Sequence, residues 1–104
     1  MHTRSSDQFQ FTFEWDTEKN ILNIEKHGVS FEEAKTIFYD PNVLYMYDPF
    51  HSDNEERFYA IGISEKLNVL IVSHCYRDEG KIIRIISARK ADKNDERVYN
   101  NNRR

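Results

Sequence analysis

Four isoleucines occupy positions 82, 83, 85 and 86, and the residue between the two pairs is Arg84. A short apolar run of this kind is typical of a strand that is buried on both faces of a sheet. An arginine keeps its charge in proteins, and burial without an anion costs several kcal/mol. The run therefore predicts that Arg84 contacts either an acidic side chain of this chain or an external phosphate.

The surrounding pattern predicts a single α+β domain over residues 1–104, since a chain of this length holds one hydrophobic core. Apolar residues alternate over 10–15, which predicts a strand, and Asp16 is placed to cap a helix over 17–27. Gly28 suits the left-handed position that ends this helix.

A second helix is expected to start at Ser30, where Ser30 and Glu33 form a capping box, and to stop before Pro41. Four strands and a final helix are predicted next, with the strands at 43–47, 57–64, 68–77 and 81–90 and the helix at 91–99. Short turns between the strands favour an antiparallel meander with the helices on one face of the sheet. The end segments, residues 1–9 and 100–104, are expected to be flexible.

Several sequence blocks follow one another in a fixed order. They include Phe-Glu-Trp-Asp at 13–16, Lys-His-Gly-Val-Ser-Phe-Glu-Glu-Ala at 26–34 and Ile-Arg-Ile-Ile-Ser-Ala-Arg-Lys-Ala at 83–91, with shorter blocks at 38–41, 56–57, 61–64 and 96–97 and Tyr99. In type, order and spacing these blocks resemble the BrnT family of type II toxins. The resemblance implies a RelE-like ribonuclease fold, an RNA substrate, and a BrnA-type antitoxin protein that neutralises the toxin in a hetero-oligomer.

The net charge of −3 conceals an uneven distribution along the chain. Residues 1–56 hold 4 Lys and Arg against 12 Asp and Glu, a balance of −8, whereas residues 57–104 hold 11 against 6, a balance of +5. The second half therefore offers basic groups for a phosphate-binding face, provided that the fold gathers them. The alternative is that the two halves neutralise each other across the fold.

The chain contains no Gly-rich phosphate loop, Walker motif or Cys/His metal spacing. The nearest metal-like group is interpreted as a solvated acidic loop and consists of His51, Asp53, Glu55 and Glu56. We therefore expect no metal and no cofactor. The favoured reaction is endoribonuclease cleavage, in which the RNA 2′-hydroxyl attacks the adjacent phosphate while protein groups move protons and stabilise charge.

Arginines suit the stabilisation of charge, because a guanidinium donates two parallel hydrogen bonds to phosphate oxygens. Arg57, Arg77 and Arg84 are predicted to hold the phosphate in catalysis, since they lie on or at the ends of the long strands. Arg89 follows Arg84 by five residues, so strand alternation places the two on opposite faces unless a bulge intervenes near Ser87. At most three of the four arginines are expected to share one site.

His74 and Tyr76 are predicted to act in proton transfer or base stacking, and a packed core histidine is the alternative for His74. RNA binding is assigned to four further residues, namely Arg89, Lys90, Lys26 and His27. Lys26 and His27 have an alternative explanation as favourable charges in the last turn of the first helix. For Arg89 the alternative is a cap at the strand end and an ion pair with an acidic group such as Glu96 or Asp92.

Tyr45 and Tyr47 share one face of a short strand and suit the docking of an antitoxin segment, with plain partial burial as the alternative. Cys75 is the only cysteine, so no internal disulfide forms and a core position is expected. The longest apolar runs are too short to cross a bilayer, and the start of the chain lacks the apolar stretch of a signal peptide. We therefore expect a cytoplasmic protein.

Three hypotheses for the function stay open. The first is a metal-independent endoribonuclease toxin. The second is a catalytically inert module with the toxin fold, which pairs with its antitoxin and contributes to repression of their operon. The third is an adaptor domain in which the arginines pair with the acidic helices.

Overall fold

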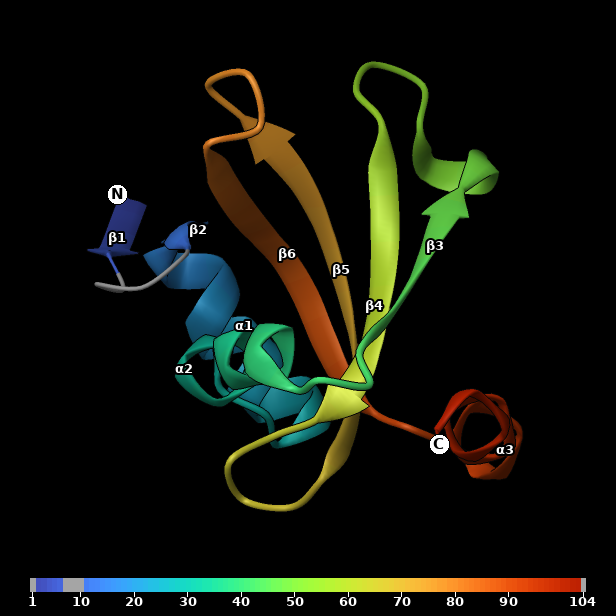
Figure 1. The fold of residues 1–104 in the computed structure, drawn as a ribbon. Helices are drawn as coiled ribbons and strands as arrows, with labels where there is room; N and C mark the ends of the chain where they lie inside the picture. Colours follow the sequence, from blue (N-terminus) through green and yellow to red (C-terminus); the bar gives the residue numbers. More distant parts are fainter. Residues whose placement is uncertain (1, 7–10, 104) are drawn as a thin grey trace.

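The computed structural model describes residues 2–6 and 11–103, which form one sheet with helices against both of its faces (Figure 1). The elements follow in the order β1 (His2–Ser6), β2 (Thr12–Asp16), α1 (Thr17–His27), α2 (Phe31–Ala34), η1 (Lys35–Tyr39), β3 (Leu44–Asp48), η2 (Pro49–His51), β4 (Arg57–Ile63), β5 (Val69–Arg77), β6 (Ile82–Lys90) and α3 (Lys93–Asn102). The strand order in the sheet is β1-β2-β6-β5-β4-β3, and β2 and β6 form its one parallel pair among the described strands. The α+β class and the antiparallel meander from β3 to β6 are confirmed.

Helix α1 has the ends that its sequence predicts. The Asp16 carboxylate accepts hydrogen bonds from the backbone N–H groups of Glu18 and Lys19, at 2.8 and 3.3 Å. Gly28 takes the left-handed conformation with φ at 70°, and its N–H donates to the carbonyl oxygen of Ile24 at 2.8 Å. These caps satisfy backbone groups that would otherwise have no partner, so the helix holds its 11 residues.

The second helix differs from the expectation. Four α-helical residues in α2 are followed by the 3₁₀ segment η1. The Ser30 hydroxyl accepts from the Glu33 N–H at 3.0 Å, which is half of a capping box. The Glu33 carboxylate does not complete the box, because it is buried and accepts instead from the Ser64 hydroxyl at 2.6 Å and the Asn68 amide at 2.9 Å. Glu33 therefore ties this helix to the β4–β5 turn.

Strands β5 and β6 are joined through a β-bulge. Ser73 pairs with Ser87, whereas His74 pairs with Ile85, so Ile86 is the extra residue. The alternation of faces along β6 is therefore reset between Ile85 and Ser87. The bulge lies next to Ser87, the position at which the sequence pattern requires one if Arg84 and Arg89 are to share a face.

The sheet has two unlike faces. Helices α1 and α2 cover the helix face, the face on which Phe13, Val72 and Ile85 belong to the main core. On the opposite face α3 covers one end of β4 and β5, where Tyr99 packs with Ile61 and Ile71. The expectation of helices on one face is therefore wrong, because β4 and β5 present apolar side chains on both faces and the second set also needs cover.

Both chain ends carry secondary structure in the described part of the chain. Residues 2–6 form β1, which pairs with β2. Without β1, β2 would be an edge strand with unpaired backbone groups. Residues 100–102 continue α3, and the Asn102 side chain donates to the Asn42 carbonyl oxygen at 3.3 Å. Residues 1, 7–9 and 104 lie outside the described part of the chain. None of the described helices is long and apolar enough to span a membrane.

Candidate active site

The four arginines of β4, β5 and β6 project from the face opposite α1 and α2, which we call the arginine face. Directly paired residues of neighbouring strands point to the same side of a sheet, and Arg84 pairs with Cys75 while Arg89 pairs with Ile71. Arg77 follows Cys75 by two residues on β5, so it shares this face. Arg57 lies there as well, two residues before Tyr59, which pairs with Ser73 of β5. The bulge thus makes a common face for all four arginines possible.

Three of these arginines are already paired with carboxylates. Arg84 lies 2.8 Å from Glu14 of β2, and both side chains are largely buried, with 14% and 11% of their surface exposed. Arg77 lies 3.2 Å from Glu55. Arg89 lies 2.9 Å from an acidic residue of α3. That residue is Asp95, one position before the expected Glu96. The acidic first half of the chain therefore neutralises Arg77 and Arg84, and Arg84 has the internal partner that its burial requires.

Arg57 stands apart from the other three. Its Nε atom is buried and has no hydrogen-bond partner among the described residues, and none of their carboxylates forms an ion pair with it. A buried N–H without a partner costs about 1–3 kcal/mol, and more when the group is charged. Arg57 is therefore the one of these four arginines whose charge no described carboxylate neutralises.

A histidine in a fixed orientation lies beside Arg57. Asp48 ends β3 with 1% of its surface exposed, and its carboxylate accepts from the Phe50 N–H at 3.1 Å and contacts His51 Nδ1 at 2.9 Å. The Tyr59 hydroxyl donates to the same carboxylate. The His51 side chain is 62% exposed, so with Nδ1 held by Asp48 its Nε2 atom is accessible from solvent. The contact with Asp48 therefore fixes the orientation of the His51 ring in the hollow.

Hydrogen bonds keep Asp48 charged despite its burial. Burial by itself raises the pKa of the Asp48 carboxyl, but the hydrogen bonds from His51, Tyr59 and the Phe50 backbone outweigh it and leave the pKa below its usual value. The buried carboxylate therefore provides a stable negative charge that orients His51.

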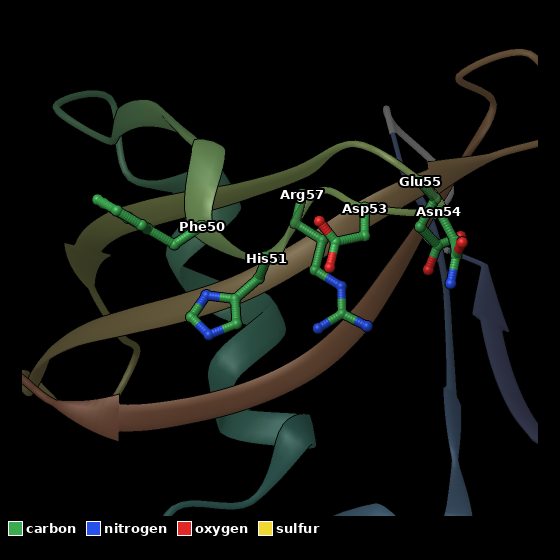
Figure 2. A pocket seen from close by; sticks show the side chains of 6 residues that line it. All are labelled: Phe50, His51, Asp53, Asn54, Glu55 and Arg57. Atoms are coloured by element: carbon green, nitrogen blue, oxygen red, sulfur yellow. The ribbon is translucent and has the colours of Figure 1, made fainter.

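Two adjoining hollows place these groups together. One of about 210 Å³ is lined by Asp48, His51, Arg57, Tyr59, Ser73, Ile86 and Ser87. The other, of about 280 Å³, shares Arg57 and His51 and extends along the η2–β4 loop to Glu55. Figure 2 shows the His51 ring and the Arg57 guanidinium pointing to the same side of this loop. We call the two together the phosphate hollow, since an anion bound to Arg57 in it lies next to His51.

The predicted proton-transfer residues lie on the other side of the sheet. His74 is fully buried on the helix face, and the rings of Phe38, Tyr45 and Phe58 surround it at centroid distances of 5.0–6.1 Å. Its Nε2 atom lies 3.3 Å from the Tyr76 hydroxyl. Burial lowers the pKa of His74 to about 4, so it is neutral near pH 7. The sheet therefore separates His74 and Tyr76 from the four arginines, and the packed-histidine alternative describes His74.

The remaining RNA-binding candidates also lie away from the arginine face, apart from Arg89. Lys26 and His27 are in the last turn of α1, which packs against the helix face. Lys90 pairs with Leu70, a residue of the main core, so it too projects toward the helix face. Basic side chains in the last turn of a helix interact favourably with its dipole, which accounts for Lys26 and His27 without RNA.

Sequence reasoning missed the pairing of His51 with Asp48. The sequence pattern groups His51 with the acidic residues that follow it, whereas its partner precedes it by three residues. The available signal was Asp48-Pro49 directly after a strand, which is typical of a capped helical turn that fixes the next few side chains. Among the described residues, no group of three or more His, Cys, Asp or Glu side chains is arranged to hold a metal ion.

Comparison with known proteins places the chain in a class of toxins. It is similar to the crystal structure of the Brucella abortus ribonuclease toxin BrnT, with a TM-score of 0.55 and 26% sequence identity over 76% of this chain and 94% of that chain. The family model for the ribonuclease toxin BrnT of type II toxin–antitoxin systems matches residues 15–95. The chain therefore belongs to the BrnT family of ribonuclease toxins. No curated protein sequence matches it.

Proposed function

We propose that this protein is a metal-independent endoribonuclease, with Arg57 as the phosphate holder and His51 as the general base. The observation that carries the proposal is the buried Nε atom of Arg57 without a partner, next to a histidine that a buried Asp48 orients. Membership of a ribonuclease toxin family supports the reaction class. A phosphate that accepts hydrogen bonds from the Arg57 guanidinium in the hollow lies next to His51.

The proposed reaction needs only groups in the phosphate hollow. His51 Nε2 takes the proton of the 2′-hydroxyl, the 2′-oxygen forms a bond to phosphorus, and the bond from phosphorus to the 5′-oxygen breaks. The products are a 2′,3′-cyclic phosphate and a 5′-hydroxyl that takes its proton from solvent. Arg57 stabilises the negative charge that builds on the non-bridging oxygens. The Ser73 and Ser87 hydroxyls, which line the same hollow, are placed to donate to these oxygens as well.

The other arginines have supporting roles in this proposal. Arg77 is 44% exposed despite its pairing with Glu55, so it is accessible to the RNA backbone on the approach to the phosphate hollow. Arg84 is largely buried against Glu14 and supports the sheet beneath the site. The assignment of His74 and Tyr76 to proton transfer is replaced by His51.

A toxin of a type II system has an antitoxin as its partner and RNA as its target. We propose an antitoxin of the BrnA type in a hetero-oligomer, and a cytoplasmic location where both RNA and antitoxin are found. The tyrosines Tyr45 and Tyr47 are 44% and 51% exposed on edge strand β3, and this supports their proposed use in antitoxin docking.

The test is RNA cleavage by the antitoxin-free protein in excess EDTA. We expect the wild type to cleave total RNA, and Arg57→Ala and His51→Ala each to lower the initial rate at least 100-fold, the order of loss when a transition-state donor or a general base is removed. The matched control is Arg97→Ala, because Arg97 is an exposed arginine of α3 that bonds only locally to Asn94.

Two results would contradict the proposal. If Arg57→Ala and His51→Ala cleave like the wild type, the phosphate hollow is not the site. If the folded wild type leaves RNA intact, including RNA in translating ribosomes, the protein is the inert module that pairs with its antitoxin. In that case the pairing of Arg77, Arg84 and Arg89 with carboxylates supports this second function.

A further inference from the structure

Phe50 has an unusual position for a phenylalanine. Its side chain lies in η2 with 84% of its surface exposed, so it contributes little to the core. Its backbone is nevertheless fixed, because the Phe50 N–H donates to the buried Asp48 carboxylate at 3.1 Å. Figure 2 shows the Phe50 ring directed away from the Arg57 guanidinium, on the other side of His51. An exposed aromatic ring on a backbone that is fixed in this way is suited to stack on a flat ligand.

The space beside Phe50 has the character of a base-binding site. A hollow of about 400 Å³, which we call the base hollow, is formed by β3, η2, β4, β5, β6 and α3. Its apolar walls include Met46 and Ile71, and its polar end is the ion pair of Arg89 with Asp95, at 2.9 Å. Largely apolar walls with a few polar groups are typical of small-ligand sites. A guanidinium donor next to a carboxylate acceptor complements a base edge, which carries acceptors and donors side by side.

The base hollow adjoins the phosphate hollow. Asp48 and Tyr59 line both the base hollow and the part of the phosphate hollow that contains Ser73. Phe50 lines both the base hollow and the part that extends toward Glu55. A nucleotide with its phosphate at Arg57 therefore has a continuous path along which its base reaches the Phe50 ring.

We propose that the base hollow is the subsite for a nucleobase next to the cleaved phosphate, with Phe50 as the stacking residue and Arg89 and Asp95 at the edge of the base. The proposal rests on the proposed function, since it places the cleaved phosphate at Arg57. The RNA target is thereby held by one base in addition to its backbone. Proteins that recognise single-stranded RNA commonly stack an unpaired base on an aromatic side chain.

The experiment uses short oligonucleotides with one cleavable ribonucleotide in a DNA background. One version is intact, and two others lack the base on the 5′ or the 3′ side of the cleaved bond. Wild type, Phe50→Ala and Phe50→Trp are compared by kcat/KM on all three. The matched control is Leu22→Ala, which removes a similarly exposed apolar side chain, 61% exposed, from α1 on the other face of the sheet.

We expect Phe50→Ala to lower kcat/KM on the intact substrate by a factor of about 5 to 100, the range that loss of base–aromatic stacking gives. With the wild type, kcat/KM on one of the two abasic substrates should be lower by a similar factor than on the intact substrate. On that abasic substrate, Phe50→Ala and the wild type should have the same kcat/KM. Phe50→Trp should retain the intact-substrate rate, and Leu22→Ala should have no effect. An equal loss with Phe50→Ala on intact and abasic substrates, or no loss on any, would overturn the proposal.

A binding measurement separates this proposal from the proposed function. Fluorescence anisotropy with a 2′-O-methyl oligonucleotide, which is not cleaved, compares the affinities for the intact and abasic versions. If the wild type cleaves no RNA but binds the intact version more tightly in a way that depends on Phe50, the proposed function fails and the base subsite stands. If the wild type cleaves RNA, but neither the loss of a base nor Phe50→Ala changes the rate or the affinity, the proposed function stands and the base subsite fails.

Discussion

Two histidines show how the surroundings of a residue decide its chemistry. His51 is exposed, and its Nδ1 atom is held by the Asp48 carboxylate at 2.9 Å. His74 is fully buried among aromatic rings, and its Nδ1 atom lies 3.2 Å from the Val72 carbonyl oxygen. Burial favours the neutral form, which lowers the pKa of His74 to about 4. Of the two, His51 is therefore the histidine that a molecule from solvent can reach, and His74 is a packing residue.

The lowered pKa of His74 makes the stability of the fold depend on pH. In the unfolded chain this histidine binds a proton below about pH 6.5, whereas in the folded protein it does so only below about pH 4. Stability is therefore lost as the pH falls between these values, and from pH 7.5 to pH 5 the loss due to His74 is about 2 kcal/mol. Urea unfolding at both pH values should show this difference between the wild type and His74→Phe.

The comparison with His74→Phe removes the contributions of other titrating groups, which both proteins share. Phenylalanine keeps an aromatic ring among Phe38, Tyr45 and Phe58 but binds no proton. If the wild type and His74→Phe lose the same free energy of unfolding from pH 7.5 to pH 5, His74 is not the neutral core histidine described here.

At the scale of elements, the pair of Arg84 with Glu14 links two neighbouring strands. The two residues are directly opposite in the parallel pairing of β2 with β6, and their side chains are 2.8 Å apart. Each side chain is largely buried, so their attraction offsets part of the cost of removing two charges from water. The ion pair thus holds an acidic strand of the first half of the chain against a basic strand of the second.

Removal of one partner of this pair should destabilise the protein strongly. We expect Arg84→Ala to lower the free energy of unfolding by about 3 kcal/mol, because the Glu14 carboxylate stays buried without this ion pair. The double variant Glu14→Gln with Arg84→Met should recover most of the loss, since it removes both charges and keeps the side-chain volume. Urea denaturation followed by circular dichroism measures both, and an Arg84→Ala protein as stable as the wild type would refute the interpretation.

At the scale of the whole molecule, one carboxylate connects the C-terminal helix with the rest of the fold. Asp40 follows η1 and accepts from the Tyr99 hydroxyl of α3 at 2.5 Å and from the Ile63 N–H of β4 at 2.8 Å. Burial raises the pKa of Asp40, but these hydrogen bonds and that from Asn42 outweigh it, so the pKa is lowered and the group stays charged. Since α3 also supplies Asp95 to the base hollow, Asp40 helps to position a wall of that site.

Loss of this connection should loosen α3. Tyr99→Phe removes the hydroxyl that donates to the charged Asp40, and we expect it to lower the free energy of unfolding by about 2 kcal/mol. Hydrogen exchange should increase in α3 more than in β5 and β6, because the ring still packs on Ile61 and Ile71 but the helix has lost a fixed point. Unchanged exchange in α3 would show that its apolar contacts alone hold it.

Much of the fold follows from local sequence, for reasons that the structure makes visible. Asp16 and Gly28 fix the ends of α1 by hydrogen bonds to residues only a few positions away, so the sequence predicts both ends of the helix. The sequence also predicts the meander from β3 to β6, because short turns between consecutive strands favour antiparallel pairing. The sequence does not predict the pairing of β1 with β2 or the position of α3 on the arginine face, since both depend on tertiary contacts.

The sequence by itself determined that Arg84 needs an anion, because an arginine keeps its charge in any fold. It also determined the family resemblance and the basic character of the second half. Tertiary structure decided which anion Arg84 has, which arginine is left without one, and which histidine stands beside it. The reason is geometric. The extra residue at Ile86 sets which side chains of β6 share a face, and the buried Asp48 carboxylate fixes the position of His51. Neither effect follows from the spacing of residues in the sequence.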